Sequence, residues 1–397
     1  MMILENVKVL DLSQIMAGPL CSMVLGDLGA DVIKIEPPEG DAARSMGDTF
    51  IKGEAGVLLS LNRNKRSIVI NLKTHEGRNI FFRMVREADV VIENFRPGVV
   101  QKLGIDYKTV SKVNPKIIYC SVAGYGQSGP YKDRPAMDPI IQAMGGIMGI
   151  TGFPETGPVK VGAPITDLVA PLLATIGIIG ALLIRDRSGK GQKIDISMLD
   201  GAIFSIIGRE NYFFIKGKKL PLTGNRNFHI APANSYLTKD EEYIMVIAHT
   251  QKHWVTLCES LGIADLANDS KFKTNPERVK NVDELDELMG KIFLERTQDE
   301  WVKYLSSKGV MAGPVYTFEK LFNDPQVLHD EIVQEVDHPV AGKINLLKTP
   351  INLHENPPKI RRPPPVLGQH TREILLEMGY SEEEIEDLKI TDVIKGS

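Results

Sequence analysis

Cysteine is scarce in this chain of 397 residues, which contains only Cys21, Cys120 and Cys258 and no CxxC pair. So small and widely spaced a set argues against a disulfide framework and predicts a reducing, cytoplasmic location. An excess of basic residues is also missing, because 47 Lys and Arg stand against 51 Asp and Glu. The cations are scattered rather than clustered, so nucleic acid is not expected as a partner.

Signals for secretion and for membrane insertion are weak. The first residues, MMILENVKVLDLSQIM, lack a basic stretch followed by an apolar core, and no signal peptide is predicted. The longest apolar run, residues 168–184, is slightly short for a membrane span and contains Pro171. Small residues such as Ala174 and Gly177 would let it pack closely. We therefore predict a buried helix of a soluble protein and no membrane partner.

Patterns for metal and nicotinamide chemistry are also thin. His249 and His253 are spaced HxxxH, but no HExxH glutamate or third ligand accompanies them, so no metal site is predicted. One GxGxxG match, GYGQSGP at residues 124–130, follows a predicted strand. Its proline, and the lack of a following strand that ends in an acid, favour a loop beside a ligand. An NAD-dependent dehydrogenase stays open as an alternative.

Short apolar runs alternate with helical patterns in the first half of the chain. Helices are expected from Pro19 and over residues 77–87, and the strands are predicted at residues 7–12, 31–35, 67–72, 89–93 and 116–122. This alternation is typical of a parallel α/β sheet with right-handed crossovers. Residues 1–200 would form this large domain.

The pattern changes after about residue 200. A helix over residues 202–216 is predicted within a linker at 201–221. Residues 222–325 then predict a small α+β domain with a strand pair near 233–248, helices bearing Trp254 and Trp301, and a return strand at 314–317. Residues 326–397 begin as an irregular, proline-rich arm and end in a helix capped at Thr371. We expect this last segment to pack on the large domain.

Asp167 is the acid with the most informative position, in VGAPITDLVAPLL, where a polar loop meets the most apolar helix. The simpler interpretation is a helix N-cap that accepts backbone hydrogen bonds. Alternatively, a carboxylate at this position could attack a thioester, if the site supplies proximity and donors for the oxyanion. The glycine-containing loops MAGP and GYGQSGP carry suitable N–H groups.

Many ordered sequence blocks together are more specific than any single motif. They include VKVLDLSQIMAGP, LGDLGADVIKIEPPEGD, NRNKRSIVINLK, ADVVIENFRPG, the TDL around Asp167 and SGKGQKIDISMLDG. Through these blocks the chain resembles the class III CoA-transferases, the formyl-CoA transferase and carnitine CoA-transferase group, over nearly its whole length. The resemblance implies a Rossmann-like large domain without a dinucleotide role, a smaller domain, and a homodimer of two interlocked, ring-shaped chains.

The resemblance also implies a reaction. CoA would move from an acyl-CoA thioester to a small carboxylic acid through an anhydride and a CoA thioester of Asp167. No tightly bound cofactor is expected, since coenzyme A is itself a substrate. Dicarboxylates, aromatic acids and hydroxy acids all stay open as acceptors.

Residues that match the family's CoA contacts can be named from the same blocks. They are Ile15, Met16, Ala17, Ile70, Asn71, Leu72, Lys73, Asn94, Phe95 and Lys102, with Arg44 as a candidate phosphate contact. Met16, Pro37 and Pro135 depart from some family members, which makes formate and oxalate less favoured substrates.

Two other functions of this fold stay open. One is a 2-methylacyl-CoA racemase, which needs an acid/base pair across the α-carbon. Met137 stands where that family has its histidine, and methionine cannot transfer a proton. The other is a CoA-binding protein without catalytic activity.

Overall fold

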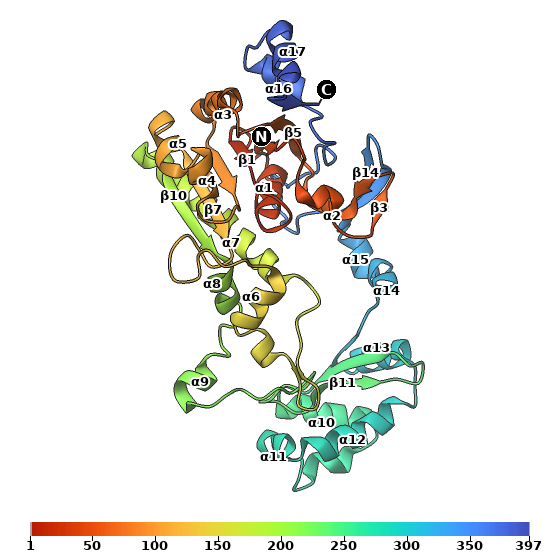
Figure 1. The fold of residues 1–397 in the computed structure, drawn as a ribbon. Helices are drawn as coiled ribbons and strands as arrows, with labels where there is room; N and C mark the ends of the chain where they lie inside the picture. Colours follow the sequence, from red (N-terminus) through yellow and green to blue (C-terminus); the bar gives the residue numbers. More distant parts are fainter. Residues whose placement is uncertain (1, 397) are drawn as a thin grey trace. The chain divides into compact units, whose positions relative to one another are not determined.

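The computed structural model describes residues 2–396, which form two compact units. The first unit is built on a seven-stranded sheet, six strands of which are parallel. That unit contains the described residues up to Ile147, then Val161–Gly208, and the chain from Asp330 onward. The parallel strands are β1 (Lys8–Asp11), β2 (Asp31–Glu36), β5 (Lys65–Ile70), β6 (Val90–Glu93), β7 (Ile118–Ala123) and β10 (Gln192–Ser197). Their order, β10-β7-β6-β1-β2-β5, is that of a Rossmann sheet (Figure 1).

The five strands predicted for this sheet are confirmed, with bounds that shift by at most two residues. The sequence interpretation missed β10, whose residues are largely exposed and partly charged and so give little apolar signal. It also missed β16 (Ile394–Lys395), which pairs antiparallel with the outer edge of β5.

Two hydrophobic layers cover the sheet. Val9 of β1 belongs to the layer that includes α1 (Ala17–Asp27) and α7 (Ile165–Ser188). The next residue, Leu10, belongs to the opposite layer with α3 (His75–Glu87). Successive residues that face opposite cores explain why these strands read as continuous apolar runs. The other elements of this unit before α7 are η1 (Ala42–Ser45), β3 (Phe50–Ile51), β4 (Glu54–Ala55), α2 (Gly56–Leu61), α4 (Val99–Leu103), α5 (Tyr107–Val113) and α6 (Asp138–Met144).

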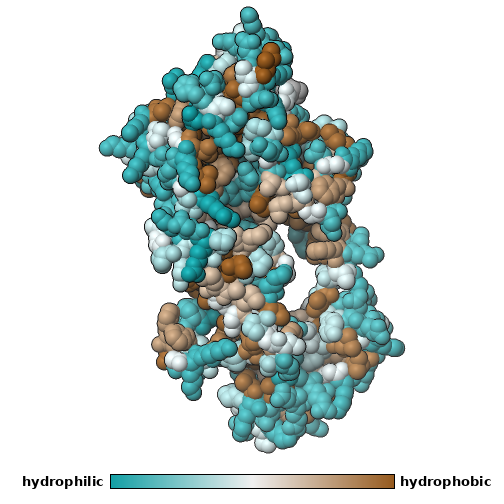
Figure 2. Space-filling model, in the orientation of Figure 1, coloured by the Kyte–Doolittle hydropathy of each residue, from teal (hydrophilic) through white to brown (hydrophobic). Residues whose placement is uncertain are grey.

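The helix α7 is only partly the buried helix that its sequence predicts. One face packs against α1, β7 and β10 and buries Ala170, Ala174, Ile178 and Ala181. The other face exposes apolar side chains, including Leu172, Ile176, Leu183 and Ile184. By length and composition α7 could also cross a membrane. Figure 2 shows hydrophobic side chains at the surface of both units.

The single helix predicted over residues 202–216 is wrong. The chain forms α8 (Met198–Phe204) and α9 (Asn211–Lys216), with turns between them. Gly208 in these turns has a φ of 90°, a conformation outside the helical region. The helical spacing of apolar residues therefore continues across the turns between α8 and α9, and only Gly208 indicated the break in the sequence.

The second unit contains residues Met148–Lys160 and Arg209–His329. Its three-stranded antiparallel sheet consists of β11 (Ala233–Leu237), β12 (Tyr243–Ile247) and β13 (Met311–Pro314). The strand pair is confirmed, whereas the return strand ends where it was predicted to begin. Trp254 and Trp301 are buried on α10 (Gln251–Ser260) and α13 (Gln298–Ser307). Besides α9, the other elements of this unit are η2 (Met148–Ile150), β8 (Gly152–Phe153), β9 (Gly157–Pro158), η3 (Ala264–Asn268), α11 (Asn275–Lys280), α12 (Val282–Phe293), α14 (Phe318–Phe322) and α15 (Pro325–His329).

The C-terminal segment is more regular than its prolines suggest. A hairpin of β14 (Val333–His338) and β15 (Gly342–Leu347) lies within the arm predicted to be irregular. Thr371 is the first residue of α16 (Thr371–Glu377) rather than its cap, which is His370. The buried hydroxyl of Thr371 donates instead to the carbonyl of Lys395. The following α17 (Glu382–Ile390) begins with a capping box that the sequence interpretation missed.

Candidate functional site

Asp167 lies in the first turn of α7, but it does not cap that helix. The N-cap residue is Pro164, and no side chain supplies a capping hydrogen bond. Asp167 instead lines a cavity of about 360 Å³ in the first unit. The helix-cap interpretation is therefore wrong, and the carboxylate is available to a bound molecule.

A second buried acid stands beside Asp167. Asp138 begins α6, and its Oδ1 accepts hydrogen bonds from the backbone N–H and the hydroxyl of Thr166, each at 2.9 Å. Burial and then the charge of Asp138 raise the pKa of Asp167 to about 6. The Asp167 carboxylate is thus partly dehydrated yet still mostly ionised at pH 7, as a carboxylate nucleophile requires.

The cavity lies at the carboxyl ends of the parallel strands. The chain passes from β1 through β2 to β5 in one direction, and from β6 through β7 to β10 in the other, so the order reverses between β1 and β6. Segments directly after these two strands line the cavity, together with the end of β7. Ligands of open α/β sheets bind at such a switch point.

Five of the predicted CoA contacts line this cavity with Asp167. They are Ile15, Met16 and Ala17 after β1, and Asn94 and Phe95 after β6. Asn94 also connects the two segments, because its side chain accepts from the N–H of Gln14 and donates to the carbonyl of Gln14, both at 2.8 Å. Asn94 therefore positions the turn after β1 as well as lining the cavity.

Three cations at the cavity were missed by the sequence interpretation. Arg96, Lys132 and Arg134 line it and are exposed. The guanidinium of Arg134 lies 3.8 Å from the centre of the Tyr131 ring, a cation–π contact. A signal was present in YKDRPAM, which places two cations directly after the glycine loop. These three cations would attract anionic ligands to this part of the cavity.

The other predicted contacts lie outside the lining of this cavity. Ile70 is buried in β5, Asn71 and Leu72 follow it, and Lys73 and Lys102 are exposed. Arg44 points to Glu36, with two hydrogen bonds of 2.7 Å. Arg44 is thus part of an internal ion pair, and contact of these residues with CoA stays a prediction.

The glycine loop after β7 does not have the geometry of a dinucleotide site. Gly124 lines the cavity, and a Cβ there would lie 2.1 Å from the Cβ of Ala136, so the close approach requires glycine. No helix begins at the glycines, since α6 starts only at Asp138. Met137, in the position of a racemase histidine, also lines the cavity.

Metal chemistry has no structural support in residues 2–396, where no group of three or more His, Cys, Asp and Glu side chains could hold an ion. The N–H of His253 donates to the hydroxyl of Thr250, which caps α10. The two histidines of the HxxxH pattern belong to the second unit, at the start of this helix.

The comparison with known families decides what this site belongs to. Residues 4–371 match the family described as CoA-transferase family III. The chain belongs to that family. Among curated proteins, it is 38% identical over 394 residues to a succinyl-CoA:glutarate CoA-transferase of Mus musculus, covering 99% of this chain and 90% of the relative. A succinyl-CoA–D-citramalate CoA-transferase of Chloroflexus aurantiacus is 36% identical over 393 residues and is covered to 98%, as is this chain.

Solved structures agree with this membership of family III. A CAIB/BAIF family protein from Brucella suis is 37% identical, with a TM-score of 0.87 over 95% of this chain and 99% of that one. The Rossmann-like strand order therefore occurs here in a CoA-transferase, and the dehydrogenase alternative is wrong.

Proposed function

We propose that this family III enzyme transfers CoA from an acyl-CoA thioester to a free carboxylic acid, with Asp167 as the covalent nucleophile. The observation that carries the proposal is the position of Asp167. Its carboxylate does not cap α7, has a pKa raised to about 6, and lines the cavity at the switch point of the sheet. A carboxylate of this kind can attack an electrophile held in the same cavity.

The proposed reaction proceeds through two kinds of covalent intermediate. An oxygen of Asp167 attacks the thioester carbonyl, the C–S bond breaks, and the products are a mixed anhydride and CoA thiolate. The thiolate then attacks the aspartyl carbonyl, which releases the donor acid and leaves a CoA thioester on Asp167. The acceptor carboxylate repeats these steps in reverse order. Protons balance without an external acid or base, so the histidine that a racemase requires is not needed.

Backbone and cationic groups at the cavity support this chemistry. The first N–H groups of a helix lack intrahelical partners, and α1 begins at Ala17 in the cavity wall. We assign to these N–H groups the stabilisation of the oxyanion that forms on the attacked carbonyl. Arg96, Lys132 and Arg134 would attract the anionic CoA, whose phosphates outweigh any other charge of the substrate.

The acceptor is proposed to be a dicarboxylate. The names of the Mus musculus and Chloroflexus aurantiacus relatives specify glutarate and D-citramalate, and both specify succinyl-CoA. Succinyl-CoA is accordingly the donor to test first.

A homodimer in the cytoplasm completes the proposal. Apolar side chains are exposed on three consecutive helices, α7, α8 and α9, among them Ile176, Phe204 and Phe214. A second copy of the chain would cover such surfaces; its interlocked form is taken from the family resemblance. The three free, buried cysteines are consistent with a reducing compartment.

Peptide mass spectrometry after incubation with a pool of acyl-CoAs, including succinyl-CoA, tests the mechanism. We expect a CoA or acyl adduct on the Asp167 peptide of the wild type and none with Asp167→Ala. Asp186→Ala is a matched control, because Asp186 lies on the same helix with its side chain 72% exposed. An adduct that persists in Asp167→Ala would contradict the assignment. Rapid loss of α-deuterium from a 2-methylacyl-CoA would instead indicate a racemase.

A further inference from the structure

We propose that the buried carboxylate of Asp41 positions the turn after β1 and thereby sets the affinity for acyl-CoA. Asp41 does not line the cavity, whereas Ile15, Met16 and Ala17 of the turn do. The proposal rests on the assignment of this cavity to acyl-CoA. It concerns the shape of the binding surface rather than the covalent step at Asp167.

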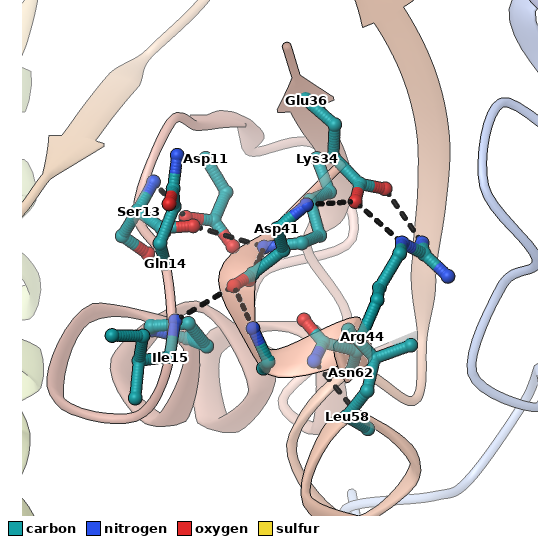
Figure 3. Close-up of polar contacts among 12 residues, drawn as sticks. Asp11, Ser13, Gln14, Ile15, Lys34, Glu36, Asp41, Arg44, Leu58 and Asn62 are labelled. Atoms are coloured by element: carbon teal, nitrogen blue, oxygen red, sulfur yellow. Dashed lines mark hydrogen bonds and ion pairs between the residues drawn. The ribbon is translucent and has the colours of Figure 1, made fainter. Parts of the chain in front are cut away.

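Ile15 shows that the turn needs an external restraint. Its φ is 68°, in the left-handed region, which β-branched residues avoid because their Cβ substituents crowd the backbone. The N–H of Ile15 donates to Oδ1 of Asp41 at 2.9 Å, and the same oxygen accepts from the N–H of Ala43 (Figure 3). A strained conformation persists only where its surroundings hold it, and Asp41 supplies that hold.

Further side chains restrain neighbouring atoms of the same turn. Lys34 connects Asp41 to the turn, since its Nζ donates to Oδ2 of Asp41 at 2.7 Å and to the carbonyl of Ser13 at 2.9 Å. Asp11 accepts from the N–H of Ser13 at 2.9 Å. Figure 3 shows Asp11, Lys34 and Asp41 gathered beside the turn. Three consecutive residues, 13, 14 and 15, are thus fixed through their backbone atoms by side chains outside the turn.

The charges that provide these contacts form one buried group, which we call the ion network. Its members are Asp11, Lys34, Glu36, Asp41, Arg44 and Lys65. Three acids balance three bases, and five of the six are at most 2% exposed. Burial lowers the pKa of Lys65 to about 8, although the charge of Asp11 acts in the opposite direction and raises it.

Stability alone does not account for the ion network. Apolar side chains of similar volume often stabilise a core as well as buried ion pairs do. Side chains of the ion network form hydrogen bonds with the backbone of one turn. These bonds fix the direction of the N–H and carbonyl groups involved, which apolar packing cannot do. That turn leads into α1, and Ile15, Met16 and Ala17 line the cavity at this point.

The test compares Asp41→Ala with Asp27→Asn and Asp41→Asn. Binding of a non-reactive thioether analogue of succinyl-CoA is measured by calorimetry, beside steady-state KM and kcat. We expect Asp41→Ala to weaken binding of the analogue by about tenfold or more, the loss typical of a hydrogen bond to a charged group, with a smaller effect on kcat. Asp41→Asn keeps an oxygen for Ile15 and should recover part of the affinity.

Asp27 provides the matched control for damage to a buried ion pair. It pairs with Arg63 at 2.6 Å at the far end of α1 and does not line the cavity. Asp27→Asn should lower the melting temperature comparably while leaving affinity for the analogue near that of the wild type. Equal affinity losses in Asp27→Asn and Asp41→Ala would overturn the proposal, because general destabilisation would then explain both.

Ile15→Gly separates positioning from a direct loss of contact. Glycine adopts positive φ without strain, so the turn should no longer need Asp41. We expect Asp41→Ala to change affinity less in the Ile15→Gly background than in the wild type. The same change in both backgrounds would overturn the positioning role. If the wild type itself fails to bind the analogue, the assignment of the cavity to acyl-CoA fails instead.

Discussion

The turn over residues 13–15 and the loop over residues 131–137 both contribute to the wall of the cavity, yet they are held in different ways. The turn is fixed by hydrogen bonds from its backbone to side chains such as Asp41 and Lys34, which are almost completely buried. The loop is mostly exposed and carries Lys132 and Arg134 toward the cavity. Backbone donors such as those of the turn must be placed accurately, so the turn needs close restraint. Exposed cations such as those of the loop act at a distance, so the loop needs less.

The largest expected effect lies outside both segments, at the proposed nucleophile Asp167, which lines the same cavity. Asp167→Ala should lower kcat for CoA transfer by on the order of 10⁴-fold, because no other group at the cavity can form the covalent intermediates. Binding of the thioether analogue should change far less. Steady-state transfer assays with succinyl-CoA and glutarate measure the first quantity, with Asp186→Ala as control. Transfer that persists in Asp167→Ala would mean that the cavity only binds its ligand.

The pH dependence of the reaction tests how Asp138 shapes the nucleophile. Asp167 must be ionised to attack, and its pKa is raised to about 6, so kcat/KM should rise with pH until the pH passes about 6. Asp138→Asn removes the neighbouring negative charge while keeping an oxygen for Thr166. The ascending limb should therefore move to lower pH, though burial will keep it above that of a free aspartate. An unchanged profile would show that Asp138 acts only through structure.

The exposed loop should respond differently from the turn. Lys132→Gln and Arg134→Gln should each weaken acyl-CoA binding about two- to fivefold, since exposed charge pairs contribute little individually. The loss should shrink at high salt, because salt screens exposed charges. Lys112→Gln on the exposed face of α5 is the control. A salt-independent loss would mean that these side chains form close contacts, and the contrast with the turn would then disappear.

Much of this organisation could be predicted from sequence, for reasons that differ between its parts. Buried parallel strands such as β7 are largely apolar runs, so most of the sheet could be predicted. Strand β10 could not, because its exposed residues include Lys193 and Asp195. Asp167 stood out by its place between a polar loop and an apolar helix, but position alone favoured a helix cap, and its role as nucleophile was predicted from the family resemblance. Its raised pKa was not, since it depends on Asp138, 29 residues earlier, and on burial.

The ion network shows the other limit of sequence reasoning. Arg44 reads as a free cation in a family-like loop, and nothing local indicates that Glu36 will face it across a turn. The positive φ of Ile15 is equally hidden, because the residue type favours the opposite conformation. Long-range partners decide both features, and a local pattern cannot name them.

The smallest expected effect on activity separates the two interpretations of Arg44. As part of the ion network it pairs with Glu36, and its side chain is 14% exposed. Arg44→Gln should then reduce the free energy of unfolding by about 2 kcal/mol, while affinity for the thioether analogue falls only slightly. As a phosphate contact it would give the reverse result, a loss of affinity with little change in stability. Urea unfolding and calorimetry on the same variant distinguish these outcomes, because the pair with Glu36 engages Nε and Nη2 of Arg44 and its loss should register in stability first.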